Sequence, residues 1–468
     1  MVSAPSVSSS ITARLRVRAR PTAVSELTTA IEAAGGIVTA LDVQSSGREQ
    51  MTVDVTCDTR GEDHATAIVA AMEAVPGVVV DRVSDRTFLA HLGGKLSIEA
   101  KVPLRNRDDL SMIYTPGVAR VCQAIAARPD DARRLTIKRN TIAVVTDGTA
   151  VLGLGDVGPL AALPVMEGKA VLFKRFAGID AFPIALDTTD VDQIVETVCA
   201  IAPVFAGINL EDISAPRCFE VEQRLRQRLD IPVFHDDQHG TAIVVVAALT
   251  NALKVVGKQI GSVRILVCGA GAAGTAVLRL LLAAGARDVV VADVDGLIHP
   301  DRPGLPDSLR WTAEHTNARH LTGPVTAGLK GADVFIGVSG PDVITGDDVA
   351  TMADDAIVFA LANPRPEVDP DEAARHAAVV GTGRSDWANQ INNVLAFPGV
   401  FRGLLDAQSR TVDDEMLLAA AHALASTVKD EELNPAYIVP SVFHPDVTSV
   451  VAAAVANAAR RAQRAPSQ

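Results

Sequence analysis

A strand–glycine–helix–strand segment at residues 262–295 constrains the fold of this chain more than any other stretch. The apolar run SVRILVC leads directly into a motif with Gly269, Gly271 and Gly274, which opens an alanine- and leucine-rich helical pattern. A second apolar run, DVVVAD, ends at Asp293, 19 residues after Gly274. In a Rossmann unit the glycines let the backbone approach a dinucleotide pyrophosphate, and the acid meets the ribose hydroxyls. The segment therefore predicts an α/β fold with a parallel sheet and a bound dinucleotide.

The residues after Asp293 indicate which dinucleotide to expect. Val294 and Asp295 follow it, and no arginine or lysine stands beside them in the sequence. Two acids would repel the 2′-phosphate of NADP. We therefore expect NAD as the cofactor, with NADP as the alternative.

Two pairs of acids follow short apolar runs in the middle of the chain. Glu211 and Asp212 come after the run at residues 203–208, and Asp236 and Asp237 follow PVFH. Such runs are typical of buried parallel strands, and ligands bind at the carboxyl ends of those strands. Converging carboxylates suit a hard divalent cation such as Mg²⁺ or Mn²⁺. The alternative, that these acids are helix N-caps, is equally compatible with their spacing.

A second glycine motif precedes a lysine with unusual neighbours. Gly153, Gly155 and Gly158 follow the predicted strand TIAVVTDG, but no acid closes a second strand, so we expect close packing or substrate binding there. Lys169 lies in the apolar stretch of the next helix, where it either extends to solvent or is a desolvated base with a lowered pKa. Tyr114, before Thr-Pro-Gly, marks a helix boundary, where packing is a tyrosine's usual role.

The first 90 residues predict a separate small domain. A serine-rich stretch at residues 1–10, expected to be loose, precedes a β-α-β-β-α-β pattern over residues 11–85, which is the ferredoxin-like order. The stretch resembles an ACT domain. ACT domains that bind an amino acid usually have a glycine in the first strand–helix turn, whereas this chain has Arg-Pro-Thr-Ala at residues 20–23. We therefore expect either an amino-acid effector site or a dimerisation module without a ligand.

Length and composition exclude several classes of protein. A chain of 468 residues is long enough for two or three domains, and 48% hydrophobic with 21% charged residues is ordinary for a globular protein. The net charge of −13 argues against a nucleic-acid partner. No apolar run approaches the roughly 18 residues of a membrane span. Five scattered cysteines without a CxxC pair favour a reducing compartment, so we expect a cytoplasmic protein.

Four blocks together resemble the malic enzymes, in particular the short bacterial type. They are SMIYTPGV, VTDGTAVLGLGDVGPLAALPVMEGKAVLFK, NLEDI and FHDDQHGTA, and the resemblance extends over about residues 95–400. Malic enzymes oxidise L-malate with NAD or NADP and release pyruvate and CO₂, using Mg²⁺ or Mn²⁺. The resemblance implies metal ligands at Glu211, Asp212 and Asp237, a base at Lys169 tuned by Asp236, and an acid at Tyr114.

The resemblance also assigns three asparagines and exposes one departure. Asn363 and Asn392 match positions beside the nicotinamide, and Asn393 matches a malate contact, although each could equally cap a turn. Large members of the family carry an arginine that binds the substrate carboxylate two residues after the Asp-Gly turn. This chain has Ala150 there. Another group must therefore bind that carboxylate.

These patterns together predict a domain organisation and a function. We expect an ACT-like domain at residues 1–90, a catalytic domain formed by residues 91–237 and 393–468, and a Rossmann domain at residues 238–392. The resemblance implies a homodimer or larger homo-oligomer that decarboxylates malate oxidatively. The alternatives are a malolactic enzyme, which returns the hydride and yields lactate, and an inactive metabolite-sensing protein.

Overall fold

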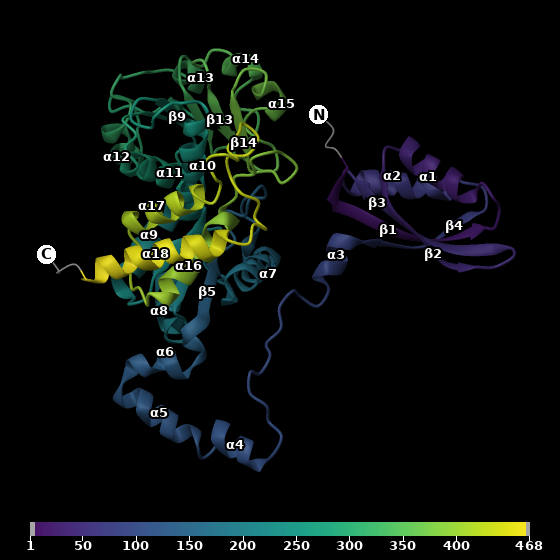
Figure 1. The fold of residues 1–468 in the computed structure, drawn as a ribbon, viewed down its shortest axis with the longest axis horizontal. Helices are drawn as coiled ribbons and strands as arrows, with labels where there is room; N and C mark the ends of the chain where they lie inside the picture. Colours follow the sequence, from purple (N-terminus) through teal and green to yellow (C-terminus); the bar gives the residue numbers. More distant parts are fainter. Residues whose placement is uncertain (1–4, 465–468) are drawn as a thin grey trace. The chain divides into compact units, whose positions relative to one another are not determined.

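The computed structural model describes residues 5–464, and the chain divides into two compact units, Met1–Ser97 and Ile98–Gln468. The first unit contains the elements β1 (Ser6–Arg18), α1 (Ala23–Ala33), β2 (Ile37–Ser46), β3 (Gln50–Thr59), α2 (Glu62–Glu73), β4 (Val78–Asp85) and α3 (Arg86–His91). Its sheet has the order β2-β3-β1-β4, and every neighbouring pair is antiparallel. Strands and helices therefore follow each other in the predicted order (Figure 1).

Alternation of side chains places the core of the first unit on one face of its sheet. In β1, Ile11, Ala13, Leu15 and Val17 are buried, while the residues between them are more exposed. Leu27 of α1 and other apolar side chains of the two helices pack on that face. The prediction of a loose start is wrong for Ser6–Ser10, which extend β1, and residues 1–4 lie outside the described part.

The second unit begins with a helical segment that buries no side chain. It consists of α4 (Arg107–Ile113), α5 (Val118–Ala127), η1 (Pro129–Asp131), α6 (Ala132–Leu135) and η2 (Ile137–Asn140), and none of these elements has a buried residue. Residues 95–106, which precede it, form no helix. We call α4 and α5 the arm; it lies apart from the sheets of its unit (Figure 1).

A four-stranded parallel sheet follows the arm. Its strands are β5 (Thr141–Thr146), β6 (Asp180–Ala185), β7 (Gly207–Leu210) and β8 (Val233–His235), in the order β6-β5-β7-β8. Helices α7 (Gly158–Ala177), α8 (Val191–Ile201) and α9 (Arg217–Arg228) connect them. The run at residues 203–208 is only partly strand, because Ala202–Val204 form a 3-10 turn (η3) around a proline that has no amide hydrogen to donate. Since β7 and β8 are neighbours, their carboxyl ends place the two acid pairs side by side.

A six-stranded sheet follows, with the order β11-β10-β9-β12-β13-β14, parallel except for the β10–β11 pair. Helix α10 (Thr241–Val255) joins the two sheets and packs against α11 (Ala272–Ala283) and α17 (Asp414–Ala425). The bounds are η4 (Asp236–Gly240), α10 (Thr241–Val255), β9 (Arg264–Cys268), α11 (Ala272–Ala283), β10 (Asp288–Asp293), β11 (Gly296–Leu297), α12 (Asp307–His315), α13 (Val325–Leu329), β12 (Val334–Gly337), α14 (Gly346–Val349), β13 (Ile357–Ala360), α15 (Pro370–Ala373) and β14 (Val379–Thr382).

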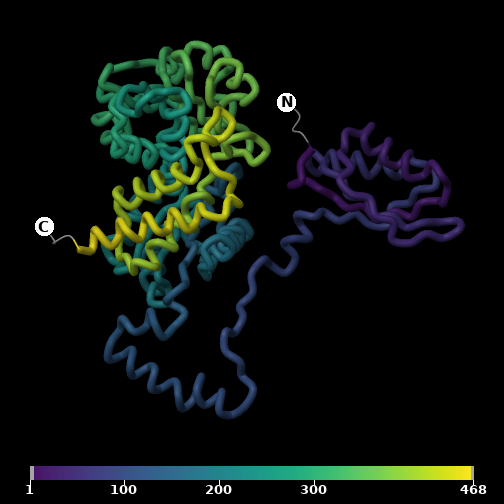
Figure 2. The backbone as a smooth tube through the Cα atoms, viewed as in Figure 1, coloured from purple at the N-terminus to yellow at the C-terminus, as the bar shows by residue number. Residues whose placement is uncertain are grey.

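The C-terminal helices return to the side of the first parallel sheet. After η5 (Asn393–Leu395), the chain forms α16 (Phe397–Asp406), α17 (Asp414–Ala425) and α18 (Val447–Arg464). Helix α18 packs on α16 and α17, and α16 contacts α7 (Figure 2). One continuous apolar core extends from the first parallel sheet through α10 to the second. Among residues 5–464, no helix has the length and apolar character needed to cross a membrane.

Candidate active site

A cavity of about 890 Å³ lies between the carboxyl ends of the two parallel sheets. Lys169 and the acids Glu211, Asp212 and Asp237 line it from the first sheet. Ser339, Asn363, Asn392 and Asn393 belong to the lining contributed by the later part of the chain. Residues more than 200 positions apart in the sequence therefore share one cavity.

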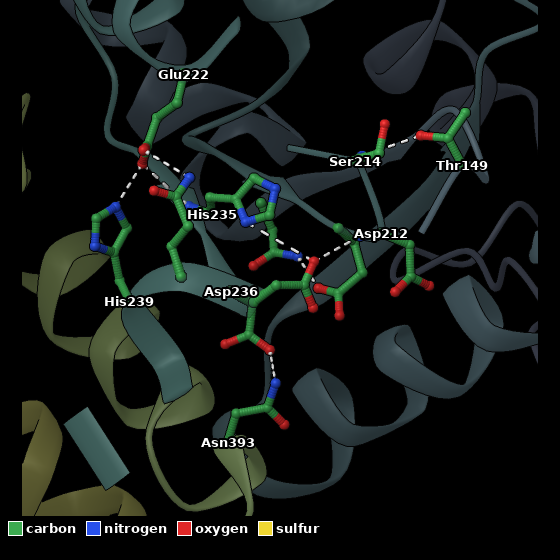
Figure 3. Close-up of polar contacts among 12 residues, drawn as sticks. Thr149, Asp212, Ser214, Glu222, His235, Asp236, His239 and Asn393 are labelled. Carbon is green, nitrogen blue, oxygen red and sulfur yellow. Dashed lines mark hydrogen bonds and ion pairs between the residues drawn. The ribbon is translucent and has the colours of Figure 1, made fainter. Parts of the chain in front are cut away.

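Three carboxylates in this cavity form a cluster. One ligand oxygen each of Glu211, Asp212 and Asp237 lies within 4.8 Å of the others. The backbone N–H of Asp212 donates to Asp237 Oδ2 at 2.8 Å, while Asp212 Oδ2 is buried without a hydrogen-bond partner (Figure 3). None of the acids caps a helix, since the N-termini of α9, η4 and α10 have no side-chain cap. The N-cap alternative is therefore wrong.

The electrostatics of this cluster favour a bound cation. Burial and the charge of Asp237 raise the pKa of Asp212 to about 8, and burial raises the pKa of Glu211 well above its ordinary value. Several carboxylates cannot all ionise at such short range unless a positive charge offsets them. The oxygen donors, their spacing and the unpartnered Asp212 oxygen fit a hard divalent cation.

Lys169 points into the protein and not to solvent. It is 7% exposed, and its ammonium donates to Asp236, lies 2.8 Å from Glu211 Oε1 and sits 4.1 Å from the ring centroid of Phe397. Burial lowers the pKa of Lys169, but the charges of Asp236 and Glu211 outweigh burial and raise it. Of the two alternatives offered by the sequence, extension to solvent is therefore wrong; the amine is desolvated, but two carboxylates raise its pKa instead of leaving it lowered.

Asp236 faces the lysine and Asn393 and does not belong to the cluster. Asn393 Nδ2 donates to Asp236 Oδ2 at 2.5 Å (Figure 3). A Cβ atom on Gly240 would lie 2.0 Å from Asp236 Oδ1, so the turn leaves room for the carboxylate only because residue 240 is glycine. Asp236 thus fixes the positions of both the amine and the amide.

The glycine motif after β9 has the close backbone contacts expected of a Rossmann turn. Gly269 has φ of +114°, and a Cβ there would lie 2.5 Å from the carbonyl oxygen of Val338. A Cβ on Gly274 would lie 1.8 Å from the carbonyl oxygen of Gly269. Gly271 immediately precedes α11, so the amide groups of that helix start face the turn.

The acid at the end of β10 has a partner that the sequence did not indicate. Arg302 Nη1 and Nη2 donate to Asp293 Oδ1 and Oδ2 at 2.7 and 2.6 Å. A cation therefore lies beside Asp293 in space, although no basic residue adjoins it in the sequence. Nothing in the local pattern pairs these residues, because a loop of irregular conformation brings Arg302 back to the strand end.

The three asparagines line the cavity, and one of them also caps a turn. Asn392 Oδ1 accepts from the backbone N–H of Val394 at 3.0 Å, at the start of η5. Gly153 packs against the Asn363–Pro364 loop, since a Cβ there would lie 3.2 Å from the Asn363 carbonyl oxygen. In the motif with Gly153, Gly155 and Gly158, Gly153 therefore permits close packing of two loops, which is one of the two roles expected for the motif.

The positions of Tyr114 and Ala150 bear on the roles that the resemblance implied. Tyr114 is 64% exposed at the end of α4 and does not line the cavity. Ala150 is half-buried and donates its N–H to the Asp212 carbonyl oxygen at 3.0 Å. Arg365, which sequence reasoning did not single out, does line the cavity.

The sequence matches two models of one family. They are "Malic enzyme, N-terminal domain", over residues 93–226, and "Malic enzyme, NAD binding domain", over residues 238–460. The chain belongs to the malic enzyme family. The predicted family, the α/β class and the Rossmann-type NAD-binding domain are thereby confirmed.

Individual malic enzymes agree with this assignment. The NAD-dependent malic enzyme of Geobacillus stearothermophilus is 54% identical over 451 residues, covering 96% of this chain and 94% of that protein. The bifunctional malic/malolactic enzyme of Bacillus subtilis is 54% identical over 368 residues, 78% of this chain and 90% of that one. The crystal structure of malic enzyme from Pyrococcus horikoshii superposes with a TM-score of 0.77 at 48% identity, covering 80% and 89% of the two chains. NADP-dependent malic enzymes are also among the relatives.

Proposed function

We propose that this chain catalyses the oxidative decarboxylation of L-malate to pyruvate and CO₂ with reduction of NAD, dependent on Mg²⁺ or Mn²⁺. The observation that supports this most directly is the shared cavity, which combines a carboxylate cluster, a buried lysine and asparagines from the dinucleotide-binding part. An absorbance assay for NADH with malate and Mn²⁺, run in parallel with NADP, tests the proposal.

Each polar residue named in the cavity has its own role in the proposed reaction. Glu211, Asp212 and Asp237 would hold the cation, which supplies Lewis-acid stabilisation of the substrate oxygen. Lys169 accepts the hydroxyl proton of malate as hydride leaves for the nicotinamide, and Asp236 orients its amine. Glu211 belongs to the carboxylate cluster and also contacts the lysine. A cation held by the cluster would offset the charge of Glu211, so Glu211 would stabilise the protonated amine less and the pKa of Lys169 would fall towards the range that a general base needs.

We further propose that Tyr114 is an acid for the protonation of C3 and reaches the cavity of a second copy of the chain. Exposed Met112 and Ile113 lie beside Tyr114 on the arm, and exposed Leu152 lines the cavity. A homodimer or larger homo-oligomer would bury both apolar surfaces. Co-expression of Lys169→Ala and Tyr114→Phe chains should give activity well above either variant alone, since one cavity in a mixed dimer has both groups.

Arg365 is the group we propose for binding a substrate carboxylate in place of the arginine missing at Ala150. Among the described residues lining the cavity, Lys169 and Arg365 carry the positive charges, and the lysine is already paired with two acids. Arg365 pairs with the exposed Asp342 at 2.9 Å. Its loop packs on Gly153, three residues after Ala150.

For the domains, we propose the boundaries expected from the sequence: residues 1–90, residues 91–237 with 393–468, and residues 238–392. The first is proposed as a ferredoxin-like, ACT-like module on the basis of its strand and helix order and its antiparallel sheet. It would bind an amino-acid effector or serve dimerisation alone. Thermal shift measurements with the twenty amino acids separate these two roles. A cytoplasmic location remains an expectation from the sequence.

A malolactic reaction is the second candidate, because the Bacillus subtilis relative is named a bifunctional malic/malolactic enzyme. In that reaction the hydride returns to the product. Product analysis distinguishes the two: pyruvate with accumulating NADH supports the first proposal, and lactate without NADH supports the second. The intact carboxylate cluster and Lys169 speak against an inactive metabolite-sensing protein.

A further inference from the structure

A buried glutamate lies behind the turn that carries the second acid pair. Glu222, on α9, is 6% exposed and does not line the cavity. Its Oε1 accepts from the backbone N–H of His235 at 3.3 Å and lies 2.8 Å from His239 Nε2. Its Oε2 accepts from Gln238 Nε2 at 3.2 Å. One carboxylate therefore contacts the chain both before and after Asp236 and Asp237.

The turn between these contacts has a conformation that needs external support. Asp236–Gly240 form a π-helical turn, a rare geometry that occurs frequently at functional sites. Its wide loop directs Asp236 towards Asn393 (Figure 3). Asp236 also contacts Lys169, and Asp237 accepts from the backbone N–H of Asp212. On the other side of the same turn, the carboxylate of Glu222 accepts from the backbone N–H of His235 and contacts His239 (Figure 3).

We propose that Glu222 is a positioning residue for the metal site: it holds the Asp236–Gly240 turn so that Asp237 joins Glu211 and Asp212 in one cluster. This inference rests on the proposed metal-dependent function. Residues that hydrogen-bond to metal ligands commonly affect the affinity for the metal without touching the ion. Glu222 differs from such direct partners because it acts on the backbone and side chains that flank a ligand.

The charge of Glu222 suits this role. Burial raises its pKa, but His239 and Arg226 outweigh burial and bring it to about 2, so the group is a carboxylate at neutral pH. A carboxylate has only acceptors, and the backbone N–H of His235, the side-chain amide of Gln238 and the guanidinium of Arg226, 2.8 Å away, are donors. In Glu222→Gln, a side chain of the same shape would turn one acceptor into an NH₂ group facing a donor. The turn would then lose an anchor without a change in volume.

The experiment measures Mn²⁺ binding by calorimetry and NADH binding by fluorescence on the full chain. Glu222→Gln should weaken Mn²⁺ roughly 10- to 100-fold, leave NADH affinity unchanged, and recover its kcat at saturating Mn²⁺. Glu220→Gln is the matched control: it lies on the same helix, is exposed and pairs with Arg224, so both affinities should stay at wild-type values. His239→Gln, a milder change, should weaken Mn²⁺ by a few-fold.

The results separate this inference from the proposed function. Wild-type Mn²⁺ affinity in Glu222→Gln would overturn the inference alone. If Glu222→Gln also loses NADH binding, His239→Gln decides, and wild-type Mn²⁺ affinity in that variant overturns the inference. A wild-type chain that binds no Mn²⁺ and oxidises no malate would overturn the proposed function itself.

Discussion

Lys169 and Asp236 form a buried ion pair although 67 residues separate them in the sequence. The pair fixes the amine next to Glu211, so that a proton leaving malate would reach Lys169 and not solvent. Lys169→Ala should therefore lower the rate of malate oxidation about 100-fold or more, as loss of a general base does. NADH production at saturating malate and Mn²⁺ measures this. Lys174→Ala, on the same helix but exposed, is the control, and near wild-type rates in Lys169→Ala would refute the base role.

Asp237→Ala should remove one of three ligand oxygens from the metal cluster. Turnover that depends on Mn²⁺ should disappear, while NADH binding persists, because the dinucleotide glycines lie on a different sheet. Fluorescence titration with NADH and a rate assay at increasing Mn²⁺ check both parts. Turnover by the wild-type chain in excess chelator would contradict the assignment of these acids.

Replacing either partner of the Asp293–Arg302 pair should change the preference between NAD and NADP, and the two replacements should change it in opposite directions. Asp293→Ser should leave Arg302 free beside the ribose position, where it can bind a 2′-phosphate. The ratio of kcat/KM for NAD to that for NADP should fall about ten-fold or more. Arg302→Ala should leave an unpaired acid and change the ratio in the opposite direction. The same direction of change in both variants would show that the pair does not discriminate between the cofactors.

Arg365→Ala should raise the KM for malate about ten-fold, the lower end of the range for a hydrogen bond to a charged group, because Arg365 is exposed. The KM for NAD should not change. Arg384→Ala serves as the control: this arginine also pairs with a nearby acid, Asp386, but does not line the cavity. A higher KM for NAD with an unchanged KM for malate would assign Arg365 to the cofactor and contradict the proposal.

Glu222 also makes stability depend on pH. Its pKa falls from an ordinary value of 4.5 to about 2 in the folded chain, so its pairing stabilises the fold above pH 4.5 and loses that effect as the pH falls through 2. Relative to wild type, Glu222→Gln should lose on the order of 3 kcal/mol at pH 7. Urea-unfolding midpoints at pH 7, 4 and 3 should converge as the pH falls. A constant difference between the two proteins would mean that the carboxylate is not held ionised.

The sequence by itself determined the parts of this protein that depend on local spacing. The Rossmann turn follows from three glycines and Asp293, since a strand, a tight turn and a helix need only neighbouring residues. The two acid pairs follow strands for the same reason, and Lys169 lies on the helix expected. Local patterns could not predict the contacts of these groups, because the spacing of glycines and acids does not show which distant loops pack together.

Only the tertiary structure decided which residues act together. Packing of α9 against the β8 turn places Glu222 beside His235 and His239, and a loop returns Arg302 to Asp293. Packing also buried Lys169 between two acids, which raised its pKa instead of lowering it, and left Tyr114 on an exposed arm. Charges and hydrogen bonds act over a few ångströms in space, whereas the sequence records separation along the chain, so these relationships appeared only once the chain was folded.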